Sequence, residues 1–368
     1  MTSMTNKLTA AAVLLFIAVA GAASLINAVI SGDKDNIAAL PENSGQGYGS
    51  ELEAAAAEKF AGRDGWIAFG SRVDSAMKGN IVNGVYVADD RLISAEGVSR
   101  KDLSRSVGYI NSFAQAYDGA VYFAAVPTSA GVYGDKLPEH ISRGAEKQLI
   151  DKLCGGLDTS IRCIDAYDLM KMMSDERIYF RSDTKWTMYG AYCVYRTVIQ
   201  KLGSQPVSYD KYHIRHVTDQ FYGDLYRKTL YMKCEPDILD IYEYPEGAEV
   251  LSCTGYDNDG YVEQVGLYDE EALESDDMYS LYLGGEYPLV RIRTDLNNDR
   301  HILVIGSRCA ASFVPFLIQH YSEVTFVRPE LMDRPLSDFL YPDDYEQTLF
   351  LFGIDSVTDS GLKYIEMR

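Results

Sequence analysis

The chain has 368 residues, a formal net charge of −20 and 28 tyrosines. This length accommodates one large domain or two domains of medium size. The acidic excess argues against nucleic-acid binding, which requires a basic surface, and against adhesion to anionic lipid. We interpret the charge as a contribution to solubility in an aqueous exterior.

The N-terminal segment predicts a membrane anchor. Lys7 is followed by an uncharged, mostly apolar run at 8–30, about the length of a helix that crosses a bilayer. The small residues of AVAGAAS would suit signal cleavage, but the apolar run continues beyond them, which favours an uncleaved anchor. The rest of the chain would then lie outside the cell membrane. We assign 1–31 to a cytoplasmic tip and transmembrane anchor, 32–50 to a polar linker and 51–368 to the main domain; secretion after cleavage is the alternative.

Strand and helix patterns alternate through the main domain. After a helical pattern from Glu51, broken at Gly62, strands are expected at VYV and RLI of NGVYVADDRLI and at AVYFAAVP, SIRCIDA, HILVIGS, SEVTFVRP and EQTLFLFGI. Helices are expected at KDLSRSVGYINSFAQAY, EKQLIDKLCGGL, DAYDLMKMM, the segment after Thr187, and AASFVPFLIQHY. This order predicts an α/β fold with a mainly parallel sheet. The stretch 206–295, rich in Tyr, Asp and Glu, is expected to be an irregular, β-rich insertion.

The six cysteines contain no CxxC pair, which argues against a zinc ribbon and against a thioredoxin-like motif. Cys154 with Cys163, or Cys234 with Cys253, are candidate disulfides if the domain is exported. Isolated buried thiols fit the sequence as well.

Ser307 is a candidate nucleophile. It follows the apolar strand HILVIG and precedes a helical pattern, and ligands of open α/β sheets bind at the carboxyl ends of strands. Backbone N–H groups at a helix N-terminus can stabilise an oxyanion there. The alternative is that Ser307 only caps the helix, because serine is a preferred N-cap residue.

A serine nucleophile needs a base, and none of the five histidines lies in a motif that supplies one. His301 opens the strand that Ser307 closes, roughly 20 Å away at about 3.3 Å per residue. His320 ends the next helical pattern, and His140 lies in a loop-like context. His213 and His216 lack a third ligand of suitable spacing, so we expect no metal site. No cofactor is expected either.

The stretch YFRSDTKWTMYGAY contains Asp183, Lys185 and Trp186 just before a helical pattern. Together with FAGRDGWIAF, VNGVYV, FYGDLY, LYLGGEYPL and LVIGSRCAASFVPFLIQHYSEVTFV, it resembles the DHHW family of bacterial envelope proteins, in that family's order. The resemblance covers the chain from about residue 51 onward. It implies kinship with alginate O-acetylation proteins and SGNH hydrolases, and so a flavodoxin-like α/β sandwich. It also implies a Ser–His–Asp site for acyl transfer or ester hydrolysis on cell-surface polysaccharide.

The sequence departs from the family pattern at positions that the resemblance assigns to the catalytic site. The resemblance places the family's serine on Ser307, its aspartate on Asp183 and its tryptophan on Trp186. The Asp-His-His-Trp motif here reads Asp-Thr-Lys-Trp, so Lys185 replaces the base histidine. The aspartate that the family usually has before the serine is Gly306.

A neutral lysine can act as a base, but its ordinary pKa of about 10.4 would have to fall, and Asp183 favours the charged form. We therefore predict an impaired enzyme that acts by binding a glycan or a partner. The alternative is an active O-acetyltransferase or acetylesterase that uses Ser307 with Lys185 as base. Arg181 is a candidate contact for an oxyanion or a sugar carboxylate, or a member of an ordinary salt bridge. Trp186 is a candidate for sugar stacking or for core packing.

The expected partners are cell-surface polysaccharide, a membrane-bound O-acyltransferase and, through the N-terminal helix, the membrane. Nucleic acid is not expected as a partner. The predicted location of the main domain is extracytoplasmic.

Overall fold

A computed structural model of the chain divides into two units, Met1–Val73 and Asp74–Arg368. The structure describes Gly65, Ala68, Gly70 and Ser71 of the first unit, and residues 80–96, 103–138, 145–230, 234–357 and 361–366 of the second. The predicted anchor and linker, and the boundaries drawn at residues 31 and 50, lie outside the described residues. Among the described residues, no helix combines the length and the apolar character needed to span a bilayer.

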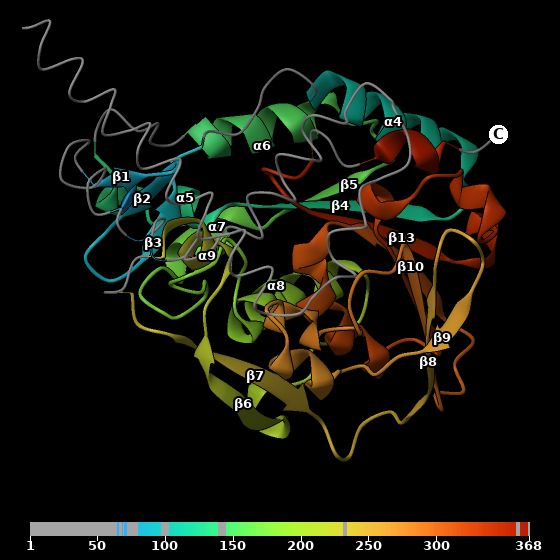
Figure 1. Ribbon diagram of the computed structural model, residues 1–368. Coiled ribbons are helices and arrows are strands. Elements are labelled where there is room, and N and C mark those ends of the chain that lie inside the picture. Colours follow the sequence, from blue (N-terminus) through green and yellow to red (C-terminus); the bar gives the residue numbers. More distant parts are fainter. Residues whose placement is uncertain are drawn as a thin grey trace, which may run out of the picture. The chain divides into compact units, whose positions relative to one another are not determined.

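An eight-stranded sheet forms the centre of the second unit (Figure 1). Its strand order is β5-β4-β13-β11-β12-β10-β8-β9. The strands are β4 (Ala120–Val126), β5 (Arg162–Asp165), β8 (Val250–Tyr256), β9 (Val262–Gln264), β10 (Leu289–Thr294), β11 (His301–Gly306), β12 (Glu323–Val327) and β13 (Gln347–Gly353).

The sheet is mixed, whereas the sequence predicts a mainly parallel one. From β5 to β12 neighbouring strands are parallel, and from β12 to β9 they are antiparallel. The stretch 206–295, predicted as an irregular insertion, supplies the antiparallel strands β8, β9 and β10. This stretch therefore extends the central sheet instead of standing apart from it.

Helices cover both faces of the sheet. They are α4 (Leu103–Ala116), α5 (Ser129–Val132), α6 (Ala145–Gly156), α7 (Tyr167–Met172), α8 (Met188–Lys201) and α9 (Asp224–Thr229). In Figure 1, α4 and α6 lie above the sheet and α8 lies below it. Side chains alternate along β11, so that Leu303 and Ile305 join one apolar cluster while Ile302 and Val304 join the other. Burial on both faces explains the almost continuous apolar sequence of this strand.

The prediction of an α-helix at AASFVPFLIQHY is wrong. The chain forms two short 3-10 helices there, η6 (Arg308–Ser312) and η7 (Val314–Gln319). Pro315 explains the difference, because proline lacks an N–H donor and its ring clashes inside an α-helix. The other 3-10 helices are η2 (Gly134–Lys136), η3 (Tyr209–Lys211), η4 (Glu270–Glu274), η5 (Met278–Leu281), η8 (Pro329–Leu331), η9 (Leu336–Asp338), η10 (Pro342–Asp344) and η11 (Leu362–Ile365).

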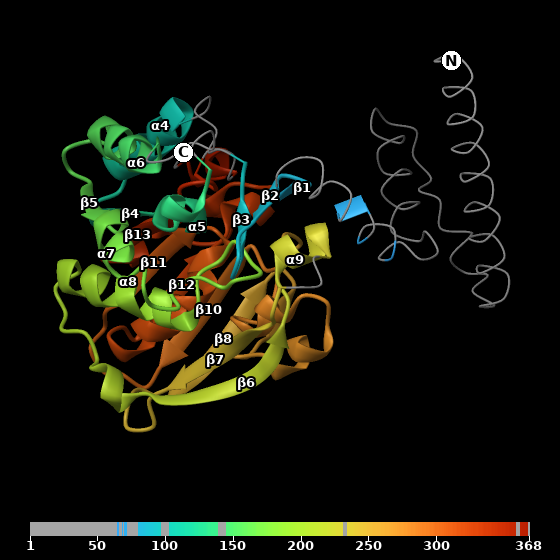
Figure 2. The same cartoon turned by 90° about the vertical axis from the view of Figure 1, so that its left-hand side faces the viewer.

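Two small antiparallel sheets accompany the main one. One contains β1 (Ile81–Val82), β2 (Val85–Val87) and β3 (Leu92–Ser94), which confirms the strand pair predicted at NGVYVADDRLI. The other is a ribbon of β6 (His213–Phe221) and β7 (Asp237–Glu243). β7 packs beside α8, and the ribbon is seen along its length in Figure 2.

A disulfide joins Cys154, near the end of α6, to Cys163 in β5. This is one of the two pairs proposed from the sequence. The members of the other pair, Cys234 and Cys253, are free thiols.

Candidate active site

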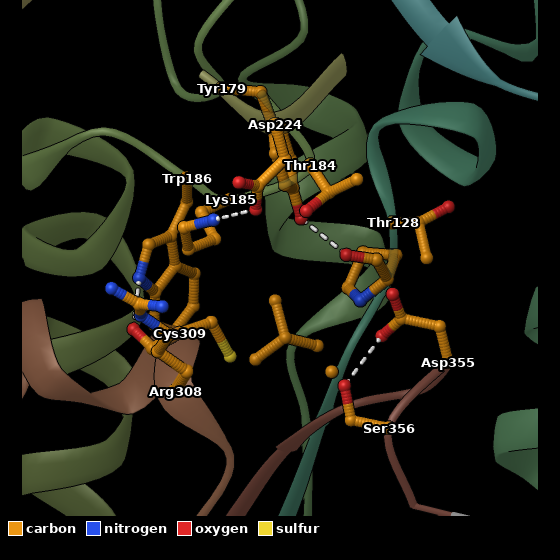
Figure 3. Close-up of a pocket in the computed structure, with 13 residues that line it drawn as sticks. Thr128, Tyr179, Thr184, Lys185, Trp186, Asp224, Arg308, Cys309, Asp355 and Ser356 are labelled. Atoms are coloured by element: carbon orange, nitrogen blue, oxygen red, sulfur yellow. Dashed lines mark hydrogen bonds and ion pairs between the residues drawn. The ribbon is translucent and has the colours of Figure 1, made fainter. Parts of the chain in front are cut away.

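A cavity of about 200 Å³ opens at the carboxyl ends of three neighbouring parallel strands, β4, β13 and β11 (Figure 3). The chain leaves these strands at Thr128, Asp355 and Arg308, and each of these residues lines the cavity. Lys185 and Trp186 enter from the segment before α8, and Asp224 enters from the start of α9. Ligands of open α/β sheets bind at this edge, so the cavity lies where the sequence predicts an active site.

Ser307 directly follows β11 and is 6 % exposed. Its Oγ accepts the backbone N–H of Gly353 at 3.3 Å and contacts Cys309 Sγ at 3.3 Å. Its side chain makes no capping hydrogen bond to η6, although it occupies the N-cap position. The Ser307 side chain therefore does not cap η6, and its role as a nucleophile stays a prediction.

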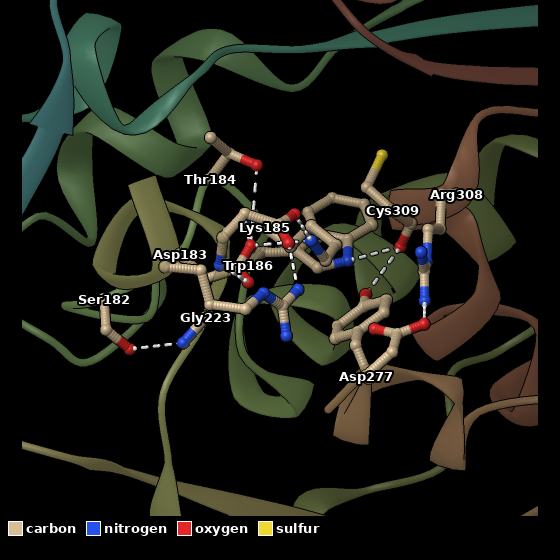
Figure 4. Close-up of polar contacts among 12 residues, drawn as sticks. Ser182, Asp183, Thr184, Lys185, Trp186, Gly223, Asp277, Arg308 and Cys309 are labelled. Atoms are coloured by element: carbon tan, nitrogen blue, oxygen red, sulfur yellow. Dashed lines mark hydrogen bonds and ion pairs between the residues drawn. The ribbon is translucent and has the colours of Figure 1, made fainter. Parts of the chain in front are cut away.

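Lys185 lies between two carboxylates (Figure 4). Its Nζ is 2.8 Å from Asp183 Oδ1 and 2.6 Å from Asp224 Oδ2, and its side chain is 8 % exposed. The backbone N–H of Lys185 also donates to Asp183 Oδ1, at 2.9 Å. Burial by itself lowers the pKa of Lys185, but the two carboxylates outweigh burial and raise that pKa above its ordinary value. The side chain is therefore an ammonium at neutral pH.

Asp224 is a site residue that sequence reasoning missed. Burial raises the pKa of Asp224, but the opposite effect of Lys185 and Arg227 is larger, and the pKa falls to about 2. The backbone N–H of Asp224 donates to Asp183 Oδ2 at 2.9 Å, which joins the two acids into one cluster. The sequence feature that could have pointed to Asp224 is the stretch FYGDLY, which contributes to the family resemblance and contains this aspartate.

Gly223 permits this contact between distant segments. A Cβ atom at Gly223 would lie 2.2 Å from Asp183 Oδ2, so a side chain there would push the segments around Asp183 and Asp224 apart. The Gly223 N–H donates to Ser182 Oγ at 3.1 Å, which fixes the approach (Figure 4). A glycine therefore precedes Asp224 for a steric reason.

In the described part of the chain, no histidine, lysine or carboxylate hydrogen-bonds Ser307 Oγ. A general base must approach its proton donor to about 2.6–3.2 Å. Neither contact of Ser307 Oγ is to Lys185, whose Nζ is held by the two acids. Among the residues that the structure describes, no histidine lines the cavity. His320 lies elsewhere, half-buried, where its Nε2 bonds Tyr195 OH at 2.7 Å.

Trp186 packs in the core and also forms part of the cavity wall. It is 1 % exposed, and its Nε1 donates to the Cys309 carbonyl at 2.7 Å and to Ser312 Oγ at 2.9 Å. These bonds satisfy its only polar group. The indole thus ties the Asp183–Trp186 segment to the turn that follows Ser307.

Arg181 lies outside this cavity. Its guanidinium pairs with Glu235 at 2.8 Å and with Asp237 at 3.4 Å, and also donates to the Pro236 carbonyl at 2.8 Å. Arg181 thus forms the ordinary salt bridges that were the alternative to a contact with an oxyanion or a sugar carboxylate. The arginine that lines the cavity is Arg308, which pairs with Asp277 and with Glu286.

Gly306 has no room for a side chain. A Cβ atom there would lie 2.4 Å from the Leu351 carbonyl oxygen and 3.1 Å from Ala310 Cβ. The neighbouring strand β13 thus fills the space that an aspartate before Ser307 would need. The backbone at this point is adapted to glycine.

We expect Gly306→Ala to lower the free energy of unfolding by about 1–3 kcal/mol, because the added methyl group forces the backbone of β13 to move. Urea denaturation measures this change. Gly108→Ala is the matched control, since Gly108 lies in α4 with nothing within 4 Å of an added Cβ. That variant should gain about 0.4–1 kcal/mol. A Gly306→Ala protein as stable as Gly108→Ala would contradict the steric argument.

The family described as DHHW protein matches residues 68–327. The chain belongs to the DHHW family. Its fold is similar to that of a DHHW family protein from Eubacterium siraeum, with a TM-score of 0.65 and 22 % identity over 77 % of this chain and 96 % of that one. It is also similar to Bacillus cereus PatB1, with a TM-score of 0.67 and 18 % identity over 76 % and 99 % of the two chains. For a PatB1 structure with a sulfonyl adduct, the TM-score is 0.64 and the identity is 20 %, over 76 % of this chain and 97 % of that one. A search of curated proteins gave no match.

This DHHW protein lacks both histidines for which the family is named. The motif reads Asp183-Thr184-Lys185-Trp186, while its first and last residues are kept. Asp183 pairs with the ammonium of Lys185, two residues later, at 2.8 Å.

Proposed function

We propose that this chain is a membrane-anchored, extracytoplasmic DHHW protein that takes part in O-acetylation of cell-envelope polysaccharide and is catalytically impaired at Ser307. It acts by binding a glycan or a partner, such as a membrane-bound O-acyltransferase. The observation that carries the loss of catalysis is the pairing of Lys185 Nζ with both Asp183 and Asp224.

Acyl transfer from a serine requires that a base take the proton of Oγ. An imidazole does so near neutral pH, where it has a free lone pair. An ammonium has three donors and no acceptor, so a charged Lys185 cannot take this proton. Deprotonation of Lys185 would also leave Asp183 without its ion-pair partner. Of the described cations, only Arg227 would still pair with Asp224. These points favour an impaired site over the alternative, an active enzyme with Lys185 as base.

The link to polysaccharide O-acetylation rests on the resemblance of this family to alginate O-acetylation proteins. PatB1, which shares the fold, has been captured with a sulfonyl adduct. Sulfonylating reagents react with activated nucleophiles, and we expect Ser307 of this chain to be unreactive toward them. The proposed location rests on the apolar run at 8–30, which is long enough to span a bilayer.

We expect the full chain, purified in mild detergent, to hydrolyse p-nitrophenyl acetate no faster than its Ser307→Ala variant. This equality should hold from about pH 6 to about pH 9, because Lys185 stays charged across that range. The initial rates of the two proteins at matched concentration give the measurement. Ser307-dependent hydrolysis that rises steeply with pH would instead identify Lys185 as a working base.

A further inference from the structure

A second, larger hollow opens beside the β6–β7 ribbon. This groove has a volume of about 880 Å³ and lies between the segment 174–181, the start of α8, η3 and the ribbon. Tyr179 lines both the groove and the cavity beside Ser307. Of the site residues predicted from the sequence, Asp183, Lys185 and Trp186 do not line the groove, whereas Arg181 does.

One wall of the groove is aromatic. The rings of Tyr189 and Tyr209 meet edge to face, with centroids 5.5 Å apart and an interplanar angle of 78°. Tyr209 is 41 % exposed, and its OH lies 3.3 Å from Tyr242 OH, which holds the ring at the rim. Ile238 is exposed beside them. An apolar wall with a few polar groups around it is typical of ligand sites.

Facing groups on the ribbon supply directed hydrogen bonds. His216 Nδ1 bonds Asp240 Oδ1 across the β6–β7 pair. An ionised carboxylate only accepts, so Nδ1 carries the hydrogen and, in the neutral ring, Nε2 is left as an acceptor. No residue that the structure describes bonds Nε2, and the ring is largely exposed in the groove. In this tautomer, His216 Nε2 can accept a hydrogen bond from a hydroxyl group of a ligand.

The charges around the groove nearly balance, although the chain carries −20. Five carboxylates and four guanidinium or ammonium groups line it, together with His216. Several are already paired, as Lys136 is with Asp90 at 2.8 Å. The carboxylates would repel a polyanion, and the arginine and lysine side chains would repel a polycation. The groove fits an uncharged ligand that offers hydroxyl groups.

Arg91 has a buried donor without a hydrogen-bond partner in the described part of the chain, at the edge of the groove. Its side chain is 9 % exposed, and its guanidinium lies 3.7 Å from the centroid of the Tyr133 ring. Its Nη1 is buried and finds no hydrogen-bond acceptor among the residues described by the structure. Buried donors are normally satisfied, and Arg91 lines the groove.

We propose that this groove binds a neutral polysaccharide, with Tyr209 and Tyr189 against the sugar rings and His216 and Arg91 on their hydroxyl groups. The inference rests on the proposed function, because it names the class of glycan that the chain would hold. It does not depend on whether Ser307 is active, since none of these residues lines the cavity beside Ser307.

Affinity electrophoresis of the full chain in mild detergent tests this proposal. Gels would contain dextran, laminarin or glycol chitin as neutral polymers, or polygalacturonate as a polyanion. We expect retardation by at least one neutral polymer and none by polygalacturonate. Tyr209→Ala and His216→Ala should weaken this binding about fivefold to tenfold each, and Tyr209→Phe should retain it.

Matched controls come from the same molecule. His213→Ala changes an exposed histidine on the same strand as His216 but outside the groove, and Tyr261→Ala removes an exposed tyrosine ring elsewhere. Both should bind like the parent. Absence of retardation by every neutral polymer, tighter binding of polygalacturonate, or equal losses in groove and control variants would overturn the proposal. The esterase comparison with Ser307→Ala is a separate readout, so failure of the proposed function would be recognised independently.

Discussion

Replacement of Lys185 by methionine should lower the free energy of unfolding by about 3–5 kcal/mol, because it leaves a buried carboxylate without its partner. Asp183 is 1 % exposed, and its Oδ1 would keep the backbone N–H of residue 185 but lose the ammonium. Methionine keeps most of the lysine chain length, so lost packing contributes little. Urea denaturation of the two proteins under the same buffer gives the difference.

Two variants separate the effect of charge from that of packing. Lys147→Met removes a more exposed lysine that also pairs with carboxylates, and we expect a loss within about 1 kcal/mol. Asp183→Asn combined with Lys185→Met should recover part of the loss, since it removes the unpaired charge. A loss from Lys185→Met as small as that from Lys147→Met would show that water, and not Lys185, stabilises the two acids.

The same cluster predicts a dependence of stability on pH. The pKa of Asp224 is lowered from 3.8 to about 2 in the folded chain, so its pairing stabilises the fold above about pH 4 and is lost as the pH falls toward 2. The pKa of Lys185 is raised, so its contribution is present through neutral pH and is lost only in strong alkali. The contribution of Asp224 to acid destabilisation should shrink in Lys185→Met, because its main partner is then absent.

Lys185→His is expected to increase Ser307-dependent ester hydrolysis by about 10²–10⁴-fold, the usual contribution of a general base. The imidazole would follow Asp183 in the family's motif order, and its ordinary pKa of about 6.5 leaves it largely neutral at pH 7 to 8. Asp183 already orients the side chain at this position through its Oδ1. Hydrolysis of p-nitrophenyl acetate at about pH 7.5 is the measurement.

Two further variants show whether the gain comes from the intended site. Lys185→His with Ser307→Ala should fall back to the parent rate, and Lys185→Met should show no gain. Equal rates for Lys185→His and Lys185→Met, with both proteins folded, would contradict the view that Lys185 occupies the place of a lost base. A gain that persists without Ser307 would assign the nucleophile elsewhere.

Much of the fold and part of the site follow from the sequence by itself. Apolar runs such as AVYFAAVP and HILVIGS predict buried strands, because the side-chain environment of a strand is set by its own local pattern. The place of Ser307 after β11, and the adjacency of Asp183, Lys185 and Trp186, are likewise properties of neighbouring residues. The sequence left the disulfide open between Cys154–Cys163 and Cys234–Cys253, with free thiols as the alternative.

Tertiary structure decided the rest. Lys185 bonds Asp224 across 39 residues of sequence, and no local pattern reports which distant acid will pack against a lysine. The antiparallel half of the sheet depends on β10 pairing with β12 and β8, which is a choice between strands and not a property of one strand. The state of Lys185 depends on the same packing, because burial and two carboxylates act on its pKa in opposite directions. The sequence by itself thus places Asp183, one of the two carboxylates, beside Lys185, and only the fold brings the second carboxylate, Asp224, to the same ammonium.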